Sequence, residues 1–196
     1  MAGKIVLVTG GARSGKSAFA ERLAAKAGES VGYIATAQIY DEEMRYRVKL
    51  HQERRPDNWQ TYEAPFGAEK ALAEAAASHT VILFDCITLY LSNLLCAIPE
   101  ADLTEERAYA DMTVQIDRLL QAAQTAAEQG VTVIFVSNEV GAGIVPENRL
   151  ARFYRDLSGL ANQRIAAAAE DVYAVLAGIP VNIKRLNTLL VQEGDR

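Results

Sequence analysis

Residues 10–17 constrain the fold of this chain more than any other feature. They read Gly-Gly-Ala-Arg-Ser-Gly-Lys-Ser and match the phosphate-binding pattern G-x-x-x-x-G-K-[ST] in full. The glycines let successive backbone N–H groups turn inward around phosphate oxygens. Lys16 can reach the outer phosphates, and the hydroxyl of Ser17 suits Mg²⁺. The pattern predicts that the chain binds a nucleoside triphosphate.

The segments on either side of this loop have the character that the pattern requires. Residues 4–9 form a short β-branched run, and residues 18–27 are strong helix formers that end before Gly28. Strand, glycine-rich turn and helix therefore follow one another in the expected order. A helix that starts near Lys16 would add the positive end of its dipole to the site.

The rest of the chain alternates between expected strands and helices. Strands are expected at residues 30–36, 59–63, 80–85, 131–137 and 171–177, with 181–184 pairing beside the last one. Helices are expected at 41–54, 68–77, 87–96, 104–128 and 146–168. This alternation predicts an α/β fold, a single domain with a mainly parallel sheet flanked by helices. Residues 187–196 carry no recognisable pattern and are expected to be loose.

Composition limits the class of protein. Half of the residues are apolar and 23% are charged, as in soluble globular proteins, and the net charge of −5 argues against a non-specific nucleic-acid surface. The apolar runs are too short for stable membrane insertion, and the first run leads into the phosphate loop instead of forming a signal peptide. Two cysteines are too few for a disulfide framework. We expect a cytoplasmic protein.

Asp85 is the candidate for a second group on the metal side of the nucleotide. It ends the apolar run 81–84, an arrangement typical of a Walker B element. In P-loop folds such a strand is expected beside the first strand, so that its carboxylate and Ser17 can share Mg²⁺. Asn138 and Glu139 follow another apolar run and are expected at the same sheet edge. Glu139 could position an attacking hydroxyl or could stabilise its loop.

His51 lies in an unusually basic helix. Arg47 and Arg54 are four residues before it and three after, so the three side chains can share one helix face, and Arg55 is adjacent. Such a surface binds anions and favours the neutral imidazole, which is a nucleophile. A solvated charged helix with an unreactive histidine remains the alternative on spacing alone. The other histidine, His79, precedes a strand and is expected to be structural.

Further segments make the chain comparable with a known family. They are residues 10–17, 33–37, 41–44, 47–56, 59–63, 85–88, 93–95 and 137–146. Together they resemble the bifunctional adenosylcobinamide kinase/adenosylcobinamide-phosphate guanylyltransferases of cobalamin biosynthesis, over about residues 5–184. The resemblance implies a RecA-like P-loop NTPase fold in residues 1–184, a C-terminal tail in 185–196, and a homotrimer.

The resemblance also implies two reactions and a set of site residues. ATP or GTP would phosphorylate adenosylcobinamide, and GMP from GTP would then pass through a GMP-histidine to adenosylcobinamide phosphate, giving adenosylcobinamide-GDP. His51 would be the guanylylated histidine, Lys16 would act in catalysis, and Ser17 and Asp85 would hold Mg²⁺. The implied nucleotide contacts are Gly10, Gly11, Ala12, Arg13, Ser14, Gly15, Lys16, Ser17, Ala35, Thr36, Ala37, Gln52, Glu53, Arg54, Arg55, Glu63 and Asp85.

Two other functions are compatible with the phosphate loop. One is a simple P-loop kinase of a small molecule, in which His51 only helps to bind phosphate. The other is a non-catalytic, regulatory NTP-binding module. For the corrinoid itself the sequence offers three apolar or aromatic candidates, which are Tyr40, Met44 and Tyr90.

Overall fold

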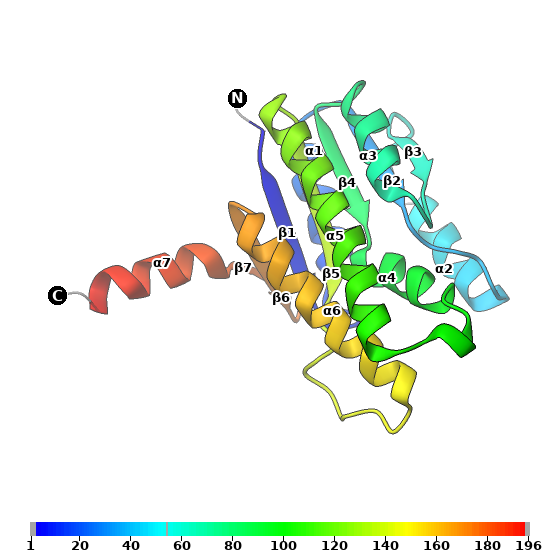
Figure 1. Ribbon diagram of the computed structural model, residues 1–196. Helices are drawn as coiled ribbons and strands as arrows, with labels where there is room; N and C mark the ends of the chain where they lie inside the picture. The colour runs from blue at the N-terminus through cyan, green and yellow to red at the C-terminus, as the bar shows by residue number, and fades with distance from the viewer. Residues whose placement is uncertain (1–2, 54, 195–196) are drawn as a thin grey trace.

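A seven-stranded sheet runs through the molecule in the order β3-β2-β4-β5-β1-β6-β7 (Figure 1). The computed structural model describes residues 3–53 and 55–194, and it describes positions 43, 47, 51 and 189–194 by their backbone alone. The strands are β1 Ile5–Gly10, β2 Val31–Ala35, β3 Gln60–Glu63, β4 Val81–Asp85, β5 Thr132–Asn138, β6 Asp171–Leu176 and β7 Ile179–Asn182. All neighbours pair in parallel except β6 and β7, which are antiparallel.

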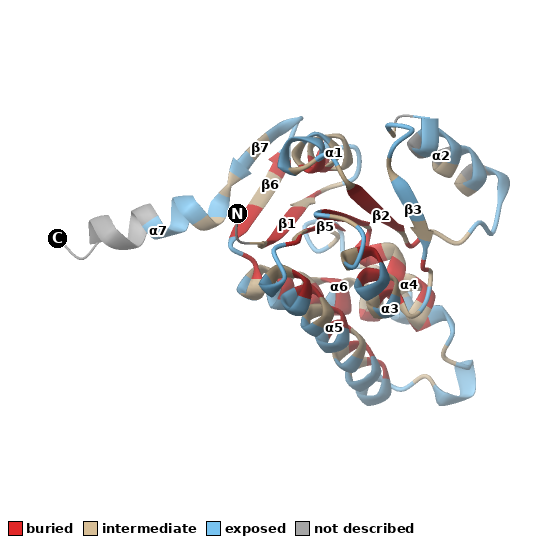
Figure 2. Ribbon diagram, turned by 90° about the horizontal axis from the view of Figure 1, so that it is seen from above, coloured by how far each residue is buried: buried red, intermediate tan, exposed pale blue. Residues whose placement is uncertain are grey.

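Helices cover both faces of this sheet. They are α1 Lys16–Ala27, α2 Glu42–Glu53, α3 Ala68–Ala76, α4 Ile87–Cys96, α5 Glu105–Glu128, α6 Arg149–Ala168 and α7 Ile183–Gly194, with a short 3₁₀ turn at Glu100–Asp102. Figure 2 shows α1 and α2 on one side of the sheet and α3 to α6 on the other, while α7 extends away from the body. None of the helices within the described ranges is long and apolar enough to cross a bilayer.

The core explains why the central strands are apolar throughout. Because helices lie on both faces, the side chains of β1, β4 and β5 are buried whichever way they point. Phe84 in β4 makes edge-to-face contacts with Phe135 in β5 and Tyr90 in α4. Tyr90 is fully buried in this cluster, so its candidacy as a corrinoid contact is wrong. Its apolar neighbours indicate that Tyr90 packs in the hydrophobic core.

The predicted elements are confirmed, with one correction to their order and small shifts at their ends. The strand that carries Asp85 does not lie beside β1, because β5 is inserted between them. The two strands are therefore about 10 Å apart. The sequence could not decide this, since the runs in β4 and β5 are equally apolar. Helix α6 begins at Arg149, where Asn148 caps it by accepting a hydrogen bond from the Ala151 N–H, instead of at residue 146.

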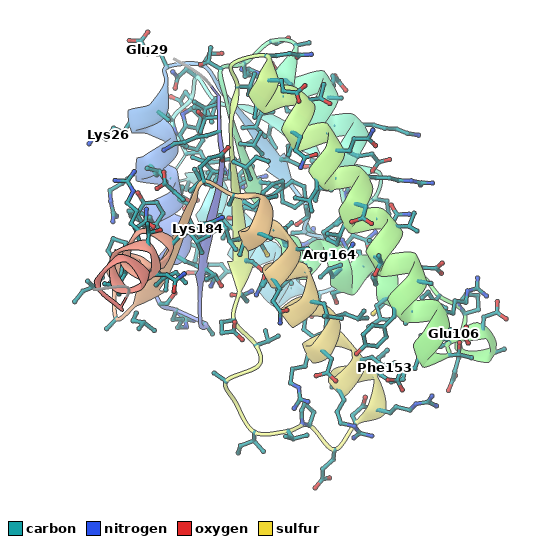
Figure 3. The ribbon with its side chains drawn as sticks, turned by 60° about the vertical axis from the view of Figure 1, so that its left-hand side comes forward. Lys26, Glu29, Glu106, Phe153, Arg164 and Lys184 are labelled. Carbon is teal, nitrogen blue, oxygen red and sulfur yellow. The ribbon has the colours of Figure 1, made fainter. Side chains whose placement is uncertain are left out.

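The C-terminal region differs most from the expectation. The last strand is Ile179–Asn182 instead of residues 181–184, and residues 187–194, where no element was expected, belong to helix α7. Lys184, in the first turn of α7, helps to hold this helix against the rest of the fold (Figure 3). Its Nζ donates to the Ala166 carbonyl at the end of α6 at 2.8 Å. The positive charge thereby meets the negative end of the α6 dipole. The division into a domain of 1–184 and a tail of 185–196 stays a prediction.

A buried carboxylate fixes the start of α7. Asp171 at the beginning of β6 accepts hydrogen bonds from Lys4 Nζ and Asn182 Nδ2, both at 2.6 Å, and from Arg185 Nε at 3.0 Å. Burial alone would raise the pKa of Asp171, but these hydrogen bonds and the charges of Lys4 and Arg185 outweigh it and hold the pKa below its usual range. The ionised side chain thus joins β1, β6, β7 and α7.

We expect Asp171→Asn to lower the free energy of unfolding by about 2 kcal/mol at neutral pH, because Lys4 and Arg185 lose their negative partner. The lowered pKa means that this stabilisation is complete above about pH 4 and is lost as the pH falls through the native pKa. Urea unfolding followed by circular dichroism at several pH values measures both effects. Asp117→Asn, which removes an exposed ion pair with Arg164, is the matched control. Equal stability losses in the two variants would contradict the interpretation.

Candidate functional site

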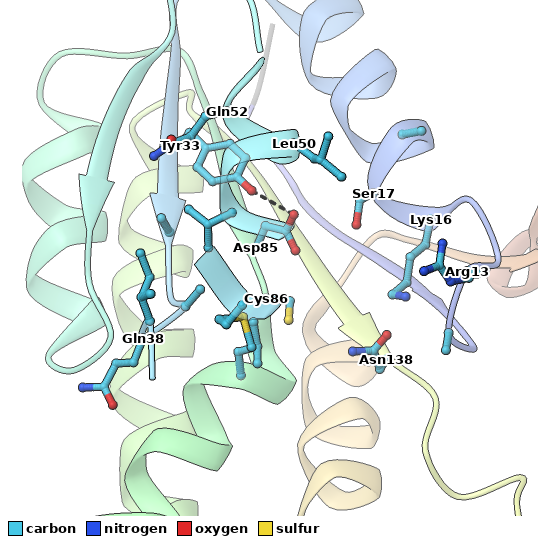
Figure 4. Close-up of a pocket in the computed structure, with 18 of the residues that line it drawn as sticks. Arg13, Lys16, Ser17, Tyr33, Gln38, Leu50, Gln52, Asp85, Cys86 and Asn138 are labelled. Atoms are coloured by element: carbon cyan, nitrogen blue, oxygen red, sulfur yellow. Dashed lines mark hydrogen bonds between the residues drawn. The ribbon is translucent and has the colours of Figure 1, made fainter. Parts of the chain in front are cut away.

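A cavity of about 1170 Å³ lies at the carboxyl edge of the sheet (Figure 4). Its walls come from the phosphate loop and α1 on one side, from α2 and β3 on the other, and from the ends of β2, β4 and β5 between them. The predicted site residues that line it are Ala12, Arg13, Ser14, Gly15, Lys16, Ser17, Ala35, Ala37, Gln52, Arg55, Glu63 and Asp85. The structure therefore brings most of the predicted nucleotide contacts into one space.

The other predicted residues lie around this lining. Gly10 and Gly11 form the base of the loop, and their carbonyls accept from the N–H groups of Glu139 and Ser14. Thr36 is fully buried, and its hydroxyl both donates to the Cys86 carbonyl and accepts from the Cys86 N–H at 2.8 Å. Exposed Glu53 pairs with Lys49. Arg54 is outside the described residues, as are the side chains of Arg47 and His51, whose backbones lie in α2.

The phosphate loop has the backbone conformation that its sequence predicts. Arg13 and Gly15 have positive φ angles of 57° and 93°, and α1 begins directly after them at Lys16. Such turns point successive amides toward one centre. The Lys16 ammonium is largely buried and donates to the Gly11 carbonyl at 3.2 Å, and burial lowers its pKa. A phosphate oxygen would be a better acceptor for this cation than a neutral carbonyl.

A distant hairpin supports this loop. The Gly178 N–H, in the turn between β6 and β7, donates to the Ser14 carbonyl at 2.8 Å. A Cβ on Gly15 would lie 3.3 Å from the Gly178 Cα, so the two turns are close-packed. Sequence reasoning did not identify Gly178 as part of the site. The only signal was a glycine between two strands, which predicts a turn but not its neighbour.

Asp85 is held by a tyrosine that the sequence also did not single out. The Tyr33 hydroxyl donates to Asp85 Oδ2 at 2.8 Å (Figure 4). The Arg55 guanidinium carbon lies 3.4 Å from the centre of the Tyr33 ring. Burial, followed by the charge of Asp85, raises the pKa of Tyr33 well above its usual range. The phenol therefore remains protonated and can act as the donor.

Asn138, the last residue of β5, and Glu139, which follows it, reach the cavity as expected. Asn138 Nδ2 donates to Thr88 Oγ1 at 2.9 Å, and Glu139 Oε1 accepts from the Gly141 N–H at 2.8 Å. Both line the cavity beside Asp85 and the phosphate loop. The Glu139 carboxylate stabilises its own loop in this structure and also borders the site. Burial raises the pKa of the neighbouring Cys86 to about 11, so this thiol stays protonated.

The residues at the end of the cavity next to the phosphate loop suit a divalent cation whose other ligands include phosphate oxygens. Ser17 offers a hydroxyl and Asp85 a carboxylate to the same cavity, and Mg²⁺ prefers such oxygen ligands. The described residues contain no cluster of three or more histidine, cysteine or acidic side chains that could hold a metal. One carboxylate and one hydroxyl fit an ion whose remaining ligands are phosphates and water.

The sequence profile of the cobinamide kinase/cobinamide phosphate guanyltransferase family matches residues 6–183. The chain belongs to this family. The bifunctional adenosylcobalamin biosynthesis protein CobU of Salmonella typhimurium is 46% identical to it over 92% of this chain and 99% of that protein. The protein CobP of Pseudomonas aeruginosa, named in the same way, is 42% identical over 91% of this chain and 96% of its own. The recognised resemblance is thus confirmed.

Solved structures confirm the fold independently of close relatives. The RadB recombinase superposes with a TM-score of 0.52 at 15% identity, covering 88% of this chain and 74% of that one. The flagellar accessory protein FlaH from Methanocaldococcus jannaschii superposes with a TM-score of 0.50 at 17% identity, covering 88% of this chain and 71% of that one. Both are RecA-like P-loop proteins, and this chain shares that fold. These likenesses concern the fold alone.

We expect Gly15→Ala to weaken nucleotide binding by roughly tenfold or more, because φ of 93° strains an alanine and its Cβ would press on the Gly178 backbone. Titration with a fluorescent GTP analogue measures this. Gly67→Ala carries a similar strain at φ 60° but meets nothing within 4 Å, and this position is not part of the cavity lining. The control should lose some thermal stability and keep its affinity. Normal affinity in Gly15→Ala would contradict the assigned loop role.

Proposed function

We propose that this chain catalyses both reactions after which its family is named. The first is phosphorylation of adenosylcobinamide by ATP or GTP, and the second is transfer of GMP from GTP to adenosylcobinamide phosphate. The observation that carries the proposal is one cavity bordered by both the phosphate loop and α2. Family membership supports the choice of substrates.

In the kinase step the loop's amides, Lys16 and the start of α1 would hold the triphosphate. Ser17 and Asp85 would hold Mg²⁺, which when bound offsets the charge of the phosphates. The corrinoid hydroxyl attacks the γ-phosphorus, the bond to the β–γ bridging oxygen breaks, the nucleoside diphosphate leaves, and the hydroxyl proton is released to solvent. Such a transfer depends on positioning and charge more than on a strong base, and Glu139, which lines the cavity, would orient the hydroxyl.

In the guanylyl step we propose that His51 is the nucleophile. Its neighbours in α2, Leu50 and Gln52, line the cavity, which supports a position within reach of a bound nucleotide. A neutral ring nitrogen attacks the α-phosphorus, the bond to the α–β bridging oxygen breaks, and pyrophosphate leaves. A phosphate oxygen of adenosylcobinamide phosphate then attacks the same phosphorus, and the phosphorus–nitrogen bond breaks to release the histidine. Arg55, with Arg47 and Arg54, would offset the negative charge.

A labelled adduct tests the histidine directly. With α-labelled GTP and Mg²⁺ we expect a protein-bound GMP that is labile to acid and stable to base, and that His51→Ala abolishes. His79→Ala is the matched control, because His79 bonds Ser30 and Tyr62 and is outside the cavity lining. It should form the adduct normally. An adduct that survives in His51→Ala would show that another residue is the nucleophile.

The same experiment separates the two alternative functions. A simple kinase would phosphorylate cobinamide without forming the adduct. A regulatory NTP-binding module would form neither product. Assays of both products in one sample therefore distinguish all three functions. The homotrimer and the cytoplasmic location remain predictions from the resemblance and composition.

We further propose that the corrinoid binds along the apolar side of the cavity. Ile39, Tyr40, Met44, Val48 and Leu50 line this side. Three of them are exposed, and Tyr40 leaves 72% of its surface in solvent. The cavity also exceeds the volume typical of a site for one small ligand. A large ring with apolar faces matches such a wall.

We expect Tyr40→Ser to raise KM for adenosylcobinamide by about tenfold and to leave KM for the nucleotide unchanged, because an aromatic contact contributes about 1–2 kcal/mol. Initial rates with each substrate varied in turn provide the measurement. Tyr46→Ser is the control, since Tyr46 lies nearby in α2 and is similarly exposed at 63% but does not line the cavity. A matching rise in nucleotide KM would place Tyr40 against the nucleotide instead.

A further inference from the structure

We propose that Tyr33 is a positioning residue that fixes the Asp85 carboxylate and the Arg55 guanidinium relative to each other, so that both can engage one nucleotide. The inference rests on the proposed function, because it assigns Asp85 to the phosphate and metal side of the cavity. Tyr33 itself is not proposed to touch the reacting atoms.

The first observation is that the Tyr33 ring cannot move easily. Tyr33 is only 2% exposed and packs in the apolar layer between the sheet and α1. Within the sheet it pairs with Leu83 of β4 on one side and with Thr61 of β3 on the other. Close packing of this kind holds a side chain in one rotamer. The phenol oxygen is therefore a fixed donor.

The second observation is that two groups of opposite charge use different parts of this ring. The hydroxyl donates to Asp85 Oδ2 at 2.8 Å, while the Arg55 guanidinium lies over the ring face at 3.4 Å. Arg55 is fixed a second time, because its Nη1 donates to Thr61 Oγ1 at 3.2 Å. Thr61 is the residue that pairs with Tyr33 across the sheet. Tyr33 of β2 thus contacts both the Arg55 guanidinium and the Asp85 carboxylate and fixes their relative positions.

The third observation is where this arrangement lies. Tyr33, Arg55 and Asp85 all line the cavity, and Figure 4 shows the phenol directed at Asp85, which stands between Tyr33 and the phosphate loop. Asp85 ends β4, and in Figure 4 it lies on the side of Tyr33 toward Ser17. Arg55 belongs to the connection from α2 to β3. Tyr33 therefore contacts a charged group from each of these two parts of the cavity. A phenylalanine would fill the same volume, so packing alone does not require the hydroxyl.

Tyr33→Phe tests the inference, because it removes the hydroxyl and keeps the ring under Arg55. We expect the affinity for a fluorescent GTP analogue to fall roughly tenfold in Mg²⁺ and less than twofold in EDTA, since the lost hydrogen bond serves a charged group on the metal side. Binding of Mn²⁺ to the complex with GTP, followed by electron paramagnetic resonance, should weaken by a similar factor. Neither readout needs the corrinoid, so the result does not depend on the proposed reactions.

Two further variants keep the test decisive. Tyr62→Phe is the matched control, because it removes a tyrosine hydroxyl from the next strand, where the partner is His79 and not a cavity residue. It should bind as the unaltered chain does, with and without Mg²⁺. Asp85→Asn should weaken binding in Mg²⁺, and adding Tyr33→Phe to it should cause no further loss. Unchanged Mg²⁺-dependent affinity in Tyr33→Phe, or equal losses in Mg²⁺ and EDTA, would overturn the proposal.

Discussion

Burial of the central strands on both faces is the constraint on which the rest of the structure depends. Helices cover β1, β4 and β5 from both sides, so these strands carry almost no polar side chains until their last residues. Polar chemistry is thereby confined to the edge where parallel strands end. Asp85 and Asn138 end β4 and β5, and the phosphate loop follows the neighbouring strand β1, so these groups meet in one cavity at this edge.

The parts of the fold and site that could be predicted are those encoded within a short stretch of chain. The loop 10–17 contains its own turn residues, its lysine and the start of its helix, and the structure places them as predicted. The ends of α4 and the N-cap of α5 at Thr104 are equally local. For such features, the residues that determine the geometry are also the residues that adopt it.

The parts that could not be predicted depend on contacts between distant segments. Tyr33 reads as an ordinary strand residue, and its role appears only when β4 brings Asp85 beside it. The insertion of β5 between β4 and β1 leaves no mark on the sequence of any of these strands. Helix α7 has one local start signal, Asn182, which accepts from the Arg185 N–H at 3.1 Å, but its first turn is also held by Asp171 and by the end of α6. Pattern reasoning has no access to such partners.

The contact between Ser14 and Gly178 has a consequence for how the protein is made. The phosphate loop precedes its supporting elements in the sequence, since β1 lies between β5 and β6 and the turn between β6 and β7 supports the loop. On the ribosome, more than 160 further residues must therefore be synthesised before the segment that supports the nascent loop is present. The nucleotide site can be completed only when the turn between β6 and β7 has emerged, so a chain translated no further than β6 lacks a finished site.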